Sequence, residues 1–331
     1  MKSDQRTSTV YLLLLAILLV VVIATVVLSV IVLTRTNEQA SQRASCDSVQ
    51  TTATAATTTQ NPSINVTDWR YRSIYHRHRI QVIVLHDTEV PTVEGTVDVL
   101  NQRNLSVHYI AGVDGTIYYL VDQTERAYHA GISSWGSHVG LNDASIGIEI
   151  VNTGVDIFPD VQVKAVAALC RKIIEKWNIS PQDIVAHGDI APSRKHDVSG
   201  WFNWTMFYAE VGLFPGLFVS NITTAQQQSI LLSTSANSAV FDANVQNLQQ
   251  RLSDYGYVSA IDVNGYFDTK TEFVVEAFNR HFCPEFFVKE GLNSSTGDYI
   301  PHPENRRWYG ISEERLTYLL ENTVRDLCAQ C

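Results

Sequence analysis

Two uninterrupted apolar runs constrain the fold of this chain more than any other feature of its sequence. The segments RIQVIVLHDT (79–88) and ASIGIEIVN (144–152) are rich in β-branched residues, and the first is bounded by charge. Strands that are covered on both faces read as continuous apolar runs, whereas strands with one solvated face alternate. We therefore expect both segments to be buried strands of a sheet on which helices pack.

Further elements follow in an alternating order. The segment VHYIAGVDGTIYYLV (107–121) contains two strand-like runs around Asp114-Gly115, which is a strong hairpin signal. DIVAHGDI (183–190) reads as a final short strand. A helix that ends near Asn178 is predicted by apolar residues at helical spacing: Val163, Val166, Leu169, Cys170, Ile173 and Trp177. These patterns predict an α/β domain over 67–218, with a mixed central β-sheet and flanking helices.

A second unit is predicted over 225–331. Val245, Leu248 and Leu252 mark a short amphipathic helix. The segment TKTEFVVEAFNRHF (269–282) reads as a second helix, with its apolar side chains inward: Phe273, Val274, Ala277, Phe278 and Phe282. We expect a small C-terminal α-helical bundle.

The N-terminal region has a different composition. Tyr11 to Leu33 carries no charge, and as a helix this run would span roughly 35 Å, enough to cross a bilayer. The run is longer than the apolar core of a cleavable signal peptide, which is about 7 to 15 residues. The sequence thus predicts a cytoplasmic segment (1–10), a transmembrane signal-anchor (11–33) whose partner is the lipid bilayer, and a Thr/Ser-rich stalk (34–66).

Other sequence signals bear on the compartment. N-x-[ST] acceptors for glycosylation occur at Asn65, Asn104, Asn178, Asn203, Asn221 and Asn293. Together with the stalk, they favour a single-pass membrane protein with an extracytoplasmic body. The formal net charge of −10 excludes nucleic acid as a partner, because phosphate binding needs clustered Lys and Arg.

The five cysteines are too few and too unevenly spaced to form a disulfide scaffold. In an oxidising compartment, Cys283 could pair with Cys328 or Cys331. Cys170 lies on the apolar face of the predicted helix, where a buried free thiol is expected.

One loop-like segment concentrates potential ligands: VAHGDIAPSRKHDVSG (185–200). His86 closes the first buried strand and His187 closes the last one, while Asp197 follows across a loop that contains a proline. A hydrolytic zinc site needs three protein ligands and one open position, and Zn²⁺ accepts imidazole and carboxylate together. His86, His187 and Asp197 could therefore complete a His/His/Asp set for Zn²⁺, whereas a single strand-end histidine is more often a hydrogen-bonded surface residue.

Two further residues fit a hydrolytic role. Glu149 lies inside the apolar strand IGIEIVN, where an unpaired carboxylate is costly unless it serves a partner or a reaction. Its placement predicts a general base, and a structural pair with Lys195 is the alternative. Lys195 lies two residues before Asp197 and could stabilise the oxyanion of a tetrahedral intermediate.

Several neighbouring residues have both a functional and a structural interpretation. Tyr128 and His129 could line a substrate groove or be ordinary packing residues. Arg194 could contact a substrate carboxylate or balance Asp189. His108 is predicted to be a hydrogen-bonded structural histidine, and His196 is predicted to be exposed to solvent.

The motifs resemble, in order, those of type 2 N-acetylmuramoyl-L-alanine amidases, zinc enzymes that share a fold with peptidoglycan recognition proteins. The resemblance covers about residues 70–215 and is carried by VIVLHDT, VHYIAGVDGTIYYLV, RAYHAG, LNDASIGIEIVN and VAHGDIAPSRKHDVSG. It implies three zinc ligands (His86, His187 and Asp197), a catalytic base (Glu149) and a transition-state stabiliser (Lys195). The sequence departs from the family pattern at Asp87, at Val198-Ser199 and at Tyr128.

The C-terminal unit resembles the three-helix peptidoglycan-binding domain that is often fused to cell-wall hydrolases. The matching positions are Leu248, Gln249, Gly256, Tyr257, Gly265, Phe267, Thr271 and Phe278, and Asn279 replaces the usual Gln. This resemblance implies that the partner is peptidoglycan or its muropeptides.

Taken together, the two resemblances imply a membrane-anchored zinc amidase that cuts the amide between N-acetylmuramic acid and L-alanine. A non-catalytic peptidoglycan receptor is the main alternative, because the same fold supports binding without catalysis. An adhesive surface protein would explain the stalk, but not the predicted ligands and base.

Overall fold

The structure is a computed structural model that describes residues 66–68, 79–289, 291 and 299–323. These residues belong to one compact unit, Pro62–Cys331. The predicted N-terminal segment, signal-anchor and stalk up to residue 65 lie outside the described residues, as do Cys46, Cys328 and Cys331. Within the described ranges, no helix combines the length and apolar character needed to cross a bilayer.

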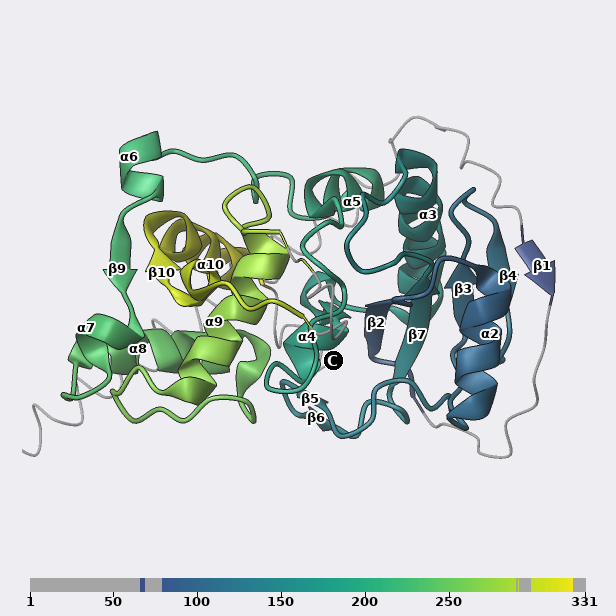
Figure 1. The fold of residues 1–331 in the computed structure, drawn as a ribbon, viewed down its shortest axis with the longest axis horizontal. Helices are drawn as coiled ribbons and strands as arrows, with labels where there is room; N and C mark the ends of the chain where they lie inside the picture. Colours follow the sequence, from purple (N-terminus) through teal and green to yellow (C-terminus); the bar gives the residue numbers. More distant parts are fainter. Residues whose placement is uncertain (1–65, 69–78, 290, 292–298, 324–331) are drawn as a thin grey trace, which may run out of the picture. The chain divides into compact units, whose positions relative to one another are not determined.

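The elements alternate as the sequence predicts (Figure 1). The strands are β1 (Val66–Asp68), β2 (Val82–Asp87), β3 (Tyr109–Ala111), β4 (Ile117–Tyr119), β5 (Ser134–Trp135), β6 (His138–Val139), β7 (Ser145–Ile150), β8 (Ile184–Ala186), β9 (Ile230–Leu232) and β10 (Trp308–Tyr309). The α-helices are α2 (Val93–Gln102), α3 (Asp160–Trp177), α4 (His187–Ile190), α5 (Trp204–Val211), α6 (Thr224–Gln227), α7 (Thr234–Asn237), α8 (Ala243–Leu252), α9 (Thr269–Phe282) and α10 (Gly310–Asn322). Short 3-10 turns cover Pro181–Asp183 and Pro303–Arg306, and a π-helical turn covers Ser253–Tyr257.

The central sheet is mixed, as predicted. Its six described strands run in the order β1-β4-β3-β7-β2-β8. β3 and β4 pair antiparallel and form the predicted hairpin, whereas the other neighbours pair in parallel. The two continuous apolar runs, β2 and β7, lie next to each other inside the sheet, which explains why neither alternates.

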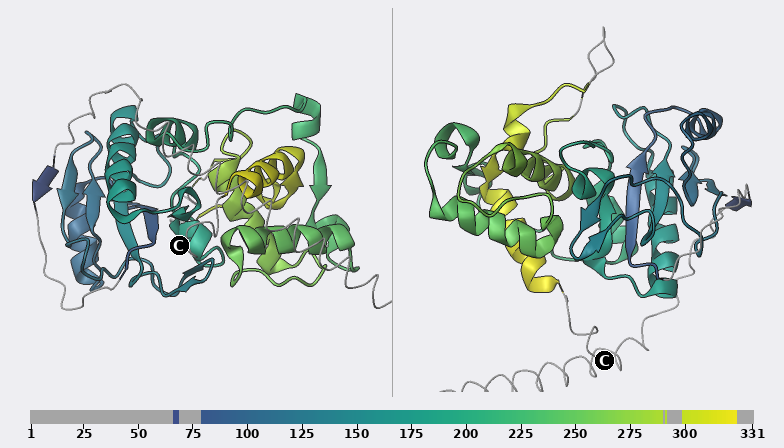
Figure 2. Two further views of the ribbon diagram at one scale, coloured as in Figure 1. Left: turned by 180° about the vertical axis from the view of Figure 1, so that it is seen from behind. Right: turned by 90° about the horizontal axis from the view of Figure 1, so that it is seen from below.

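Helices cover both faces of the sheet. Ile110 packs in one apolar cluster with Val93 and Leu100 of α2, while its neighbours Tyr109 and Ala111 belong to the large core that includes α3. Because successive strand residues point to opposite faces, α2 and α3 must lie on opposite sides. Figure 2 shows this arrangement from two further directions.

Helix α3 is tied to the sheet by more than its apolar face. The predicted residues Val163, Val166, Leu169, Cys170 and Ile173 are buried, and Trp177 is half-buried. The buried Gln162 donates to the carbonyls of Ala111 (3.0 Å) and Val151 (2.9 Å). Asn178 ends the helix in the left-handed conformation, with φ at 52°.

The segment predicted as a final strand over 183–190 is shorter than expected. β8 ends at Ala186, and His187 begins the helical turn α4. The Asp189 carboxylate accepts the backbone N–H of Ala186 (2.8 Å), which turns the chain out of the sheet. The strand prediction was therefore wrong beyond Ala186, because a side-chain contact decides where the strand ends.

The C-terminal unit contains the predicted helices. Val245, Leu248 and Leu252 of α8 are buried, as are Val274, Ala277, Phe278 and Phe282 of α9. Phe273 was predicted to face inward but is only half-buried, and the Arg306 guanidinium lies 5.1 Å from the centre of its ring. The unit is also not purely helical, since β9 and β10 form a two-stranded antiparallel sheet.

The described cysteines and glycosylation acceptors can be placed. Cys170 is a buried free thiol, as predicted, and Cys283 is also free and buried. Both cysteines suggested as partners of Cys283 lie outside the described residues. The four described acceptor residues, Asn104, Asn178, Asn203 and Asn221, are all exposed.

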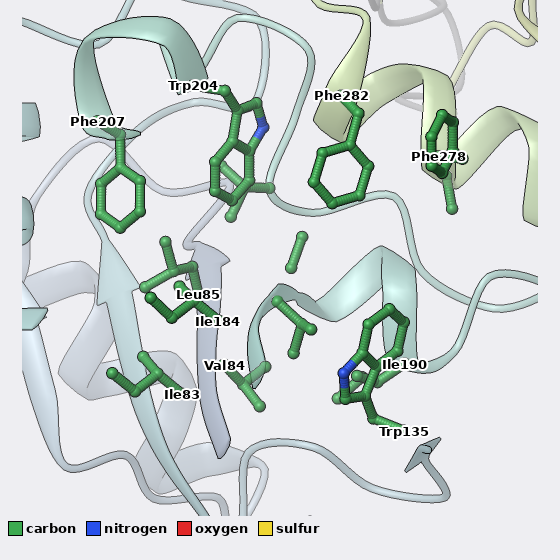
Figure 3. Close-up of a cluster of buried hydrophobic side chains, with 14 of the residues drawn as sticks. Ile83, Val84, Leu85, Trp135, Ile184, Ile190, Trp204, Phe207, Phe278 and Phe282 are labelled. Carbon is green, nitrogen blue, oxygen red and sulfur yellow. The ribbon is translucent and has the colours of Figure 1, made fainter. Parts of the chain in front are cut away.

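One apolar core joins the sheet domain to the C-terminal helices. Trp204 of α5 lies opposite Phe282 of α9, and Trp135 lies beside Ile190 of α4 (Figure 3). Trp135 also packs edge-on against Tyr255 and Tyr257, with ring centroids 5.7 and 4.9 Å apart. The largest apolar cluster of the structure contains residues from both parts of the chain.

Candidate metal centre

Three buried side chains converge at the carboxyl ends of β2 and β8. His86 Nδ1 lies 3.0 Å from His187 Nδ1 and 3.1 Å from Asp197 Oδ2, and the last two atoms are 3.0 Å apart. No other group of three or more metal-ligating side chains was found among the described residues. The three predicted ligands therefore lie together.

The fold explains this convergence. β2 and β8 are parallel neighbours, so His86, near the end of β2, and His187, directly after β8, meet at one edge of the sheet. Asp197 returns through the following loop, and its carbonyl accepts the N–H of Gly188 at 2.5 Å. This backbone contact links His187 and Asp197, two of the predicted ligands, which are ten positions apart in the sequence.

Each imidazole is oriented by its second nitrogen. His187 Nε2 donates to the Ala130 carbonyl at 3.2 Å. His86 Nε2 contacts His129 Nδ1 at 3.0 Å, and His129 Nε2 contacts Ser145 Oγ at 3.3 Å. Ser145 Oγ donates to the Leu141 carbonyl, so it accepts a hydrogen bond from His129 Nε2. His129 Nδ1 then accepts from His86 Nε2, which leaves the lone pair of His86 on Nδ1.

The donor set fits a zinc ion. With both other nitrogens acting as donors, His86 Nδ1 and His187 Nδ1 face each other as acceptors, which is unfavourable unless a cation lies between them. In a tetrahedral site with bonds of about 2.0–2.1 Å, ligand atoms lie roughly 3.3 Å apart. The observed separations of 3.0–3.1 Å are close to this value.

Two of the predicted ligands, His86 and Asp197, have pKa values that suit cation binding. Burial and the neighbouring His187 lower the pKa of His86 to about 4, so the imidazole is neutral at physiological pH. Burial alone would raise the pKa of Asp197, but His187 and His86 outweigh it and hold this pKa well below the ordinary value. A metal ion needs neutral imidazole and ionised carboxylate.

Glu149 lies beside this group. It is paired in register with His86 on the adjacent strand, so both side chains project from the same face of the sheet. Its Oε2 is buried and has no hydrogen-bond partner among the described residues. Burial, followed by the charges of Asp197 and Asp87, raises the pKa of Glu149 well above its usual range, while Lys195 acts in the opposite direction.

Two of the three departures from the family pattern contact each other. The buried Asp87 accepts the backbone N–H of Ser199 at 2.7 Å, which fastens the loop that follows Asp197. Burial raises the pKa of Asp87 to about 8, and the Asp197 charge adds to this effect. The third departure, Tyr128, is half-buried with the Arg126 guanidinium 4.8 Å above its ring.

Comparisons with known proteins agree with this geometry. Residues 76–200 match the family model for N-acetylmuramoyl-L-alanine amidase, and residues 242–286 match a model described as a putative peptidoglycan binding domain. N-acetylmuramoyl-L-alanine amidase AmiD of Escherichia coli is 31% identical over 229 residues, which cover 64% of this chain and 78% of AmiD. This chain belongs to the N-acetylmuramoyl-L-alanine amidase family.

Other relatives of this amidase give the same result. A putative N-acetylmuramoyl-L-alanine amidase of Rickettsia conorii is 32% identical over 240 residues, covering 70% of this chain and 81% of the relative. Among solved structures, the complex of E. coli AmiD with the substrate anhydro-N-acetylmuramic acid-L-Ala-D-gamma-Glu-L-Lys has a TM-score of 0.55 at 25% identity. That match covers 76% of this chain and 92% of the AmiD chain. AmpDh3 of Pseudomonas aeruginosa shares the fold, with a TM-score of 0.53 at 23% identity.

The remaining candidate residues of the amidase have different surroundings. His129 is buried, and its Nδ1 contacts His86 Nε2 at 3.0 Å. Arg194 donates to the carbonyls of Ala130 (3.0 Å) and Ile132 (2.9 Å), which fastens this loop. Its contact with a substrate carboxylate stays a prediction. Lys195 is half-buried, and its charge lowers the pKa of Glu149.

Two other histidine predictions have opposite outcomes. His108 is a structural histidine, as predicted, since its ring accepts the N–H of Gly147 (3.0 Å) and donates to the Glu125 carbonyl (3.1 Å). His196 was predicted to be exposed but is half-buried and stacks on Tyr299, with centroids 4.2 Å apart. The stacking partner lies about a hundred residues away, so no local pattern could indicate it.

Sequence reasoning missed the groups that orient the ligands. The Ala130 carbonyl carries no sequence signal at all. Ser145 follows a loop and begins β7, where its role depends on His129 lying across from it. Asp189 and His281 contact each other at 2.7 Å, and no local sequence pattern indicates this pair.

Proposed function

We propose that this amidase hydrolyses the amide between N-acetylmuramic acid and L-alanine of peptidoglycan, with zinc held by His86, His187 and Asp197. One observation carries the proposal: a triangle of two imidazole nitrogens and a carboxylate oxygen lies beside a carboxyl group whose buried Oε2 lacks a partner in the described structure. The substrate named for the AmiD complex contains this bond type, which supports the same substrate class here.

The residues of the chain have distinct roles in this proposal. When bound, the zinc ion supplies Lewis-acid polarisation of the scissile carbonyl and activation of water. Glu149 accepts a proton from the attacking water and passes it to the leaving amine, a role that its raised pKa suits. The Lys195 ammonium stabilises the negative charge that develops on the carbonyl oxygen.

Two further residues fix the geometry of this reaction. His129 and Arg194 act behind the ligands: His129 orients the His86 ring, and Arg194 holds the Ala130 carbonyl to which His187 donates. We place Tyr128 at the substrate groove as a contact residue, supported by its partial exposure.

We also propose that the amidase is anchored in a membrane by the segment 11–33, with its catalytic domain extracytoplasmic. Support comes from the uncharged run Tyr11 to Leu33, from the stalk composition, and from the exposure of the four described acceptor asparagines. Protease accessibility of the body on intact cells that express the full chain would test this topology.

The catalytic proposal is tested with residues 66–331 and purified peptidoglycan. New L-alanine amino termini should appear with zinc and should disappear after chelation. Glu149→Gln should lower the rate by about 10² to 10⁴ while zinc still binds, because the substitution removes the base but no ligand. Glu94→Gln, on the exposed face of α2, is the matched control and should leave the rate unchanged.

The receptor alternative gives a different outcome in the same assay. If the zinc-loaded protein binds peptidoglycan but releases no L-alanine amino termini, the amidase activity of this chain is ruled out. If Glu149→Gln keeps the wild-type rate, the base has been assigned wrongly, although the activity stands.

A further inference from the structure

A buried hydrogen bond connects the C-terminal helices to the turn that carries His187. His281 of α9 donates from Nδ1 to Asp189 Oδ2 at 2.7 Å, and both side chains are 1% exposed. Tyr208 of α5 contacts His281 Nε2 at 2.9 Å, so both nitrogens of this ring have partners. The contact joins positions 92 residues apart in the sequence.

Asp189 receives further donors. The Tyr257 hydroxyl donates to Asp189 Oδ1 at 2.7 Å, and the Ala186 N–H donates to Oδ2 at 2.8 Å. A buried carboxylate is stabilised only when its oxygens accept such donors. Two of the three donors come from the C-terminal part of the chain, so Asp189 depends on that part for its position.

The position of Asp189 in turn affects the metal centre. Asp189 holds the first turn of α4, and His187 is the first residue of that helix. The next residue, Gly188, donates its N–H to the carbonyl of Asp197, the third ligand. A shift of Asp189 would thus move the backbone of two ligands together.

Packing at this contact leaves little freedom. The His281 ring lies on Trp204 and on Phe282, with centroids 3.7 and 3.9 Å away. A Cβ added at Gly188 would lie 3.4 Å from Arg280 Nη1, which shows that α9 approaches α4 closely. Interiors packed in this way transmit displacements rather than absorbing them.

We propose that His281 and Tyr257, both within the C-terminal part of the chain, are positioning residues for the zinc centre and act through Asp189 and α4. The C-terminal part is then a component of the catalytic unit and not only an attachment to the wall. This inference rests on the proposed zinc site and concerns its affinity for the metal.

The first test compares two Tyr→Phe substitutions in the same zinc-loaded protein. Tyr257→Phe removes one donor to Asp189 and keeps the ring that packs on Trp135. Tyr318→Phe is the matched control, because it removes the hydroxyl of α10 that accepts the Gly216 N–H, a hydrogen bond outside the α4 contact. The zinc dissociation constant is measured by competition with a chromogenic chelator, and the thermal midpoint is recorded beside it.

We expect Tyr257→Phe to raise the zinc dissociation constant about tenfold, as for partners that orient metal ligands indirectly, and Tyr318→Phe to change it less than about twofold. Both variants should lower the thermal midpoint to a similar extent. Equal zinc affinities for the two variants would overturn the inference, whichever affinity they share.

A second pair keeps the inference testable if Tyr257→Phe does not fold. His281→Asn retains an N–H that can reach Asp189 but loses ring packing, whereas His281→Leu retains apolar volume and loses the donor. If the hydrogen bond to Asp189 matters, the variant that keeps the donor should keep more zinc affinity. His281→Asn should then bind zinc more tightly than His281→Leu, even if it is the less stable of the two. Affinity that follows stability instead would mean that His281 is only a packing residue.

The wild-type protein separates this inference from the proposed function. If the wild-type chain binds zinc and releases L-alanine amino termini but the variants match their controls, only the positioning role is wrong. If the wild-type chain binds no zinc, the proposed function fails and the positioning role fails with it.

Discussion

Gly147 of β7 leaves room for the ring of His129, which contacts His86. A Cβ at this position would lie 2.6 Å from Nδ1 and Cγ of His129, and His129 is buried. The ring cannot move aside without leaving His86 and Ser145, which its two nitrogens contact. At the residue scale, the absence of a side chain at Gly147 therefore lets His129 orient the predicted ligand His86.

We expect Gly147→Ala to destabilise the protein by about 1–3 kcal/mol, because overpacking displaces buried groups. It should also weaken zinc binding about tenfold through the displaced His129. Guanidinium unfolding and zinc competition measure the two effects. Gly291→Ala is the control, since the nearest atom of the described residues to its added Cβ is Cδ1 of Ile300, 3.8 Å away. Zinc affinity that is unchanged in Gly147→Ala would mean that His129 does not orient His86.

At the element scale, the turn after α8 is fitted to the sheet domain. A Cβ at Gly256 would lie 2.4 Å from Cζ2 of Trp135, and the Gly256 carbonyl accepts the N–H of Gly136 at 2.8 Å. Trp135 is 1% exposed, and its Nε1 donates to the Gln182 carbonyl, so the indole is fixed. Position 256 therefore needs glycine, because a side chain there would overlap the indole of Trp135.

We expect Gly256→Ala to lower the free energy of unfolding by about 1–3 kcal/mol, because either the indole or the turn must shift. Chemical denaturation of this variant beside Gly291→Ala would measure the loss. A variant as stable as wild type would show that the contact between this turn and Trp135 is loose, contrary to the packing described above.

Helix α9 also carries a buried ionic cluster. Glu276 contacts Arg280 (3.3 Å), Arg306 (2.7 Å) and the Tyr299 hydroxyl (2.7 Å). Burial alone would raise the pKa of Glu276, but Arg280, Tyr299 and Arg306 outweigh it and lower the pKa. The ionised carboxylate is therefore favoured in the folded state.

We expect Glu276→Gln to destabilise the protein by about 3 kcal/mol at pH 7, because it removes the carboxylate that faces two guanidinium groups. Since the folded pKa lies below the ordinary 4.5, this stabilisation is present above pH 4.5 and is lost as the pH falls through the folded pKa. Unfolding measured at pH 7 and at pH 4 should show the difference from wild type shrinking on acidification. A constant difference would assign the loss to packing.

At the scale of the whole molecule, the shared core predicts that the sheet domain depends on the C-terminal helices. Trp135 and Trp204 are almost fully buried, and their ring contacts include Tyr255, Tyr257 and His281. Exposing a large apolar side chain costs about 1.5–3 kcal/mol, and total stabilities are about 5–15 kcal/mol.

A chain that ends at residue 218 should therefore lose cooperative folding or aggregate. Near-ultraviolet circular dichroism and a thermal scan of this fragment, beside residues 66–331, would report the loss. A fragment that unfolds cooperatively near the temperature of the longer chain would show that the two parts are independently stable.

The sequence by itself determined most elements of the fold and which side chains are candidates for the site. Buried strands, the hairpin and the main helices follow from periodicity and turn residues, which are local properties. His86 and His187 could be paired from sequence because each follows a strand-like run, and parallel strands end at one edge of a sheet.

Only the tertiary structure decided how these groups are oriented and where the local patterns stop. The end of β8 at Ala186, the burial of His129 and the stacking of His196 all depend on partners that are distant in sequence or on side-chain contacts. The link from His281 to α4 is of the same kind. Periodicity reports which face of an element is apolar, but it contains no information about which distant group will lie against a given polar side chain, because packing alone brings the two together.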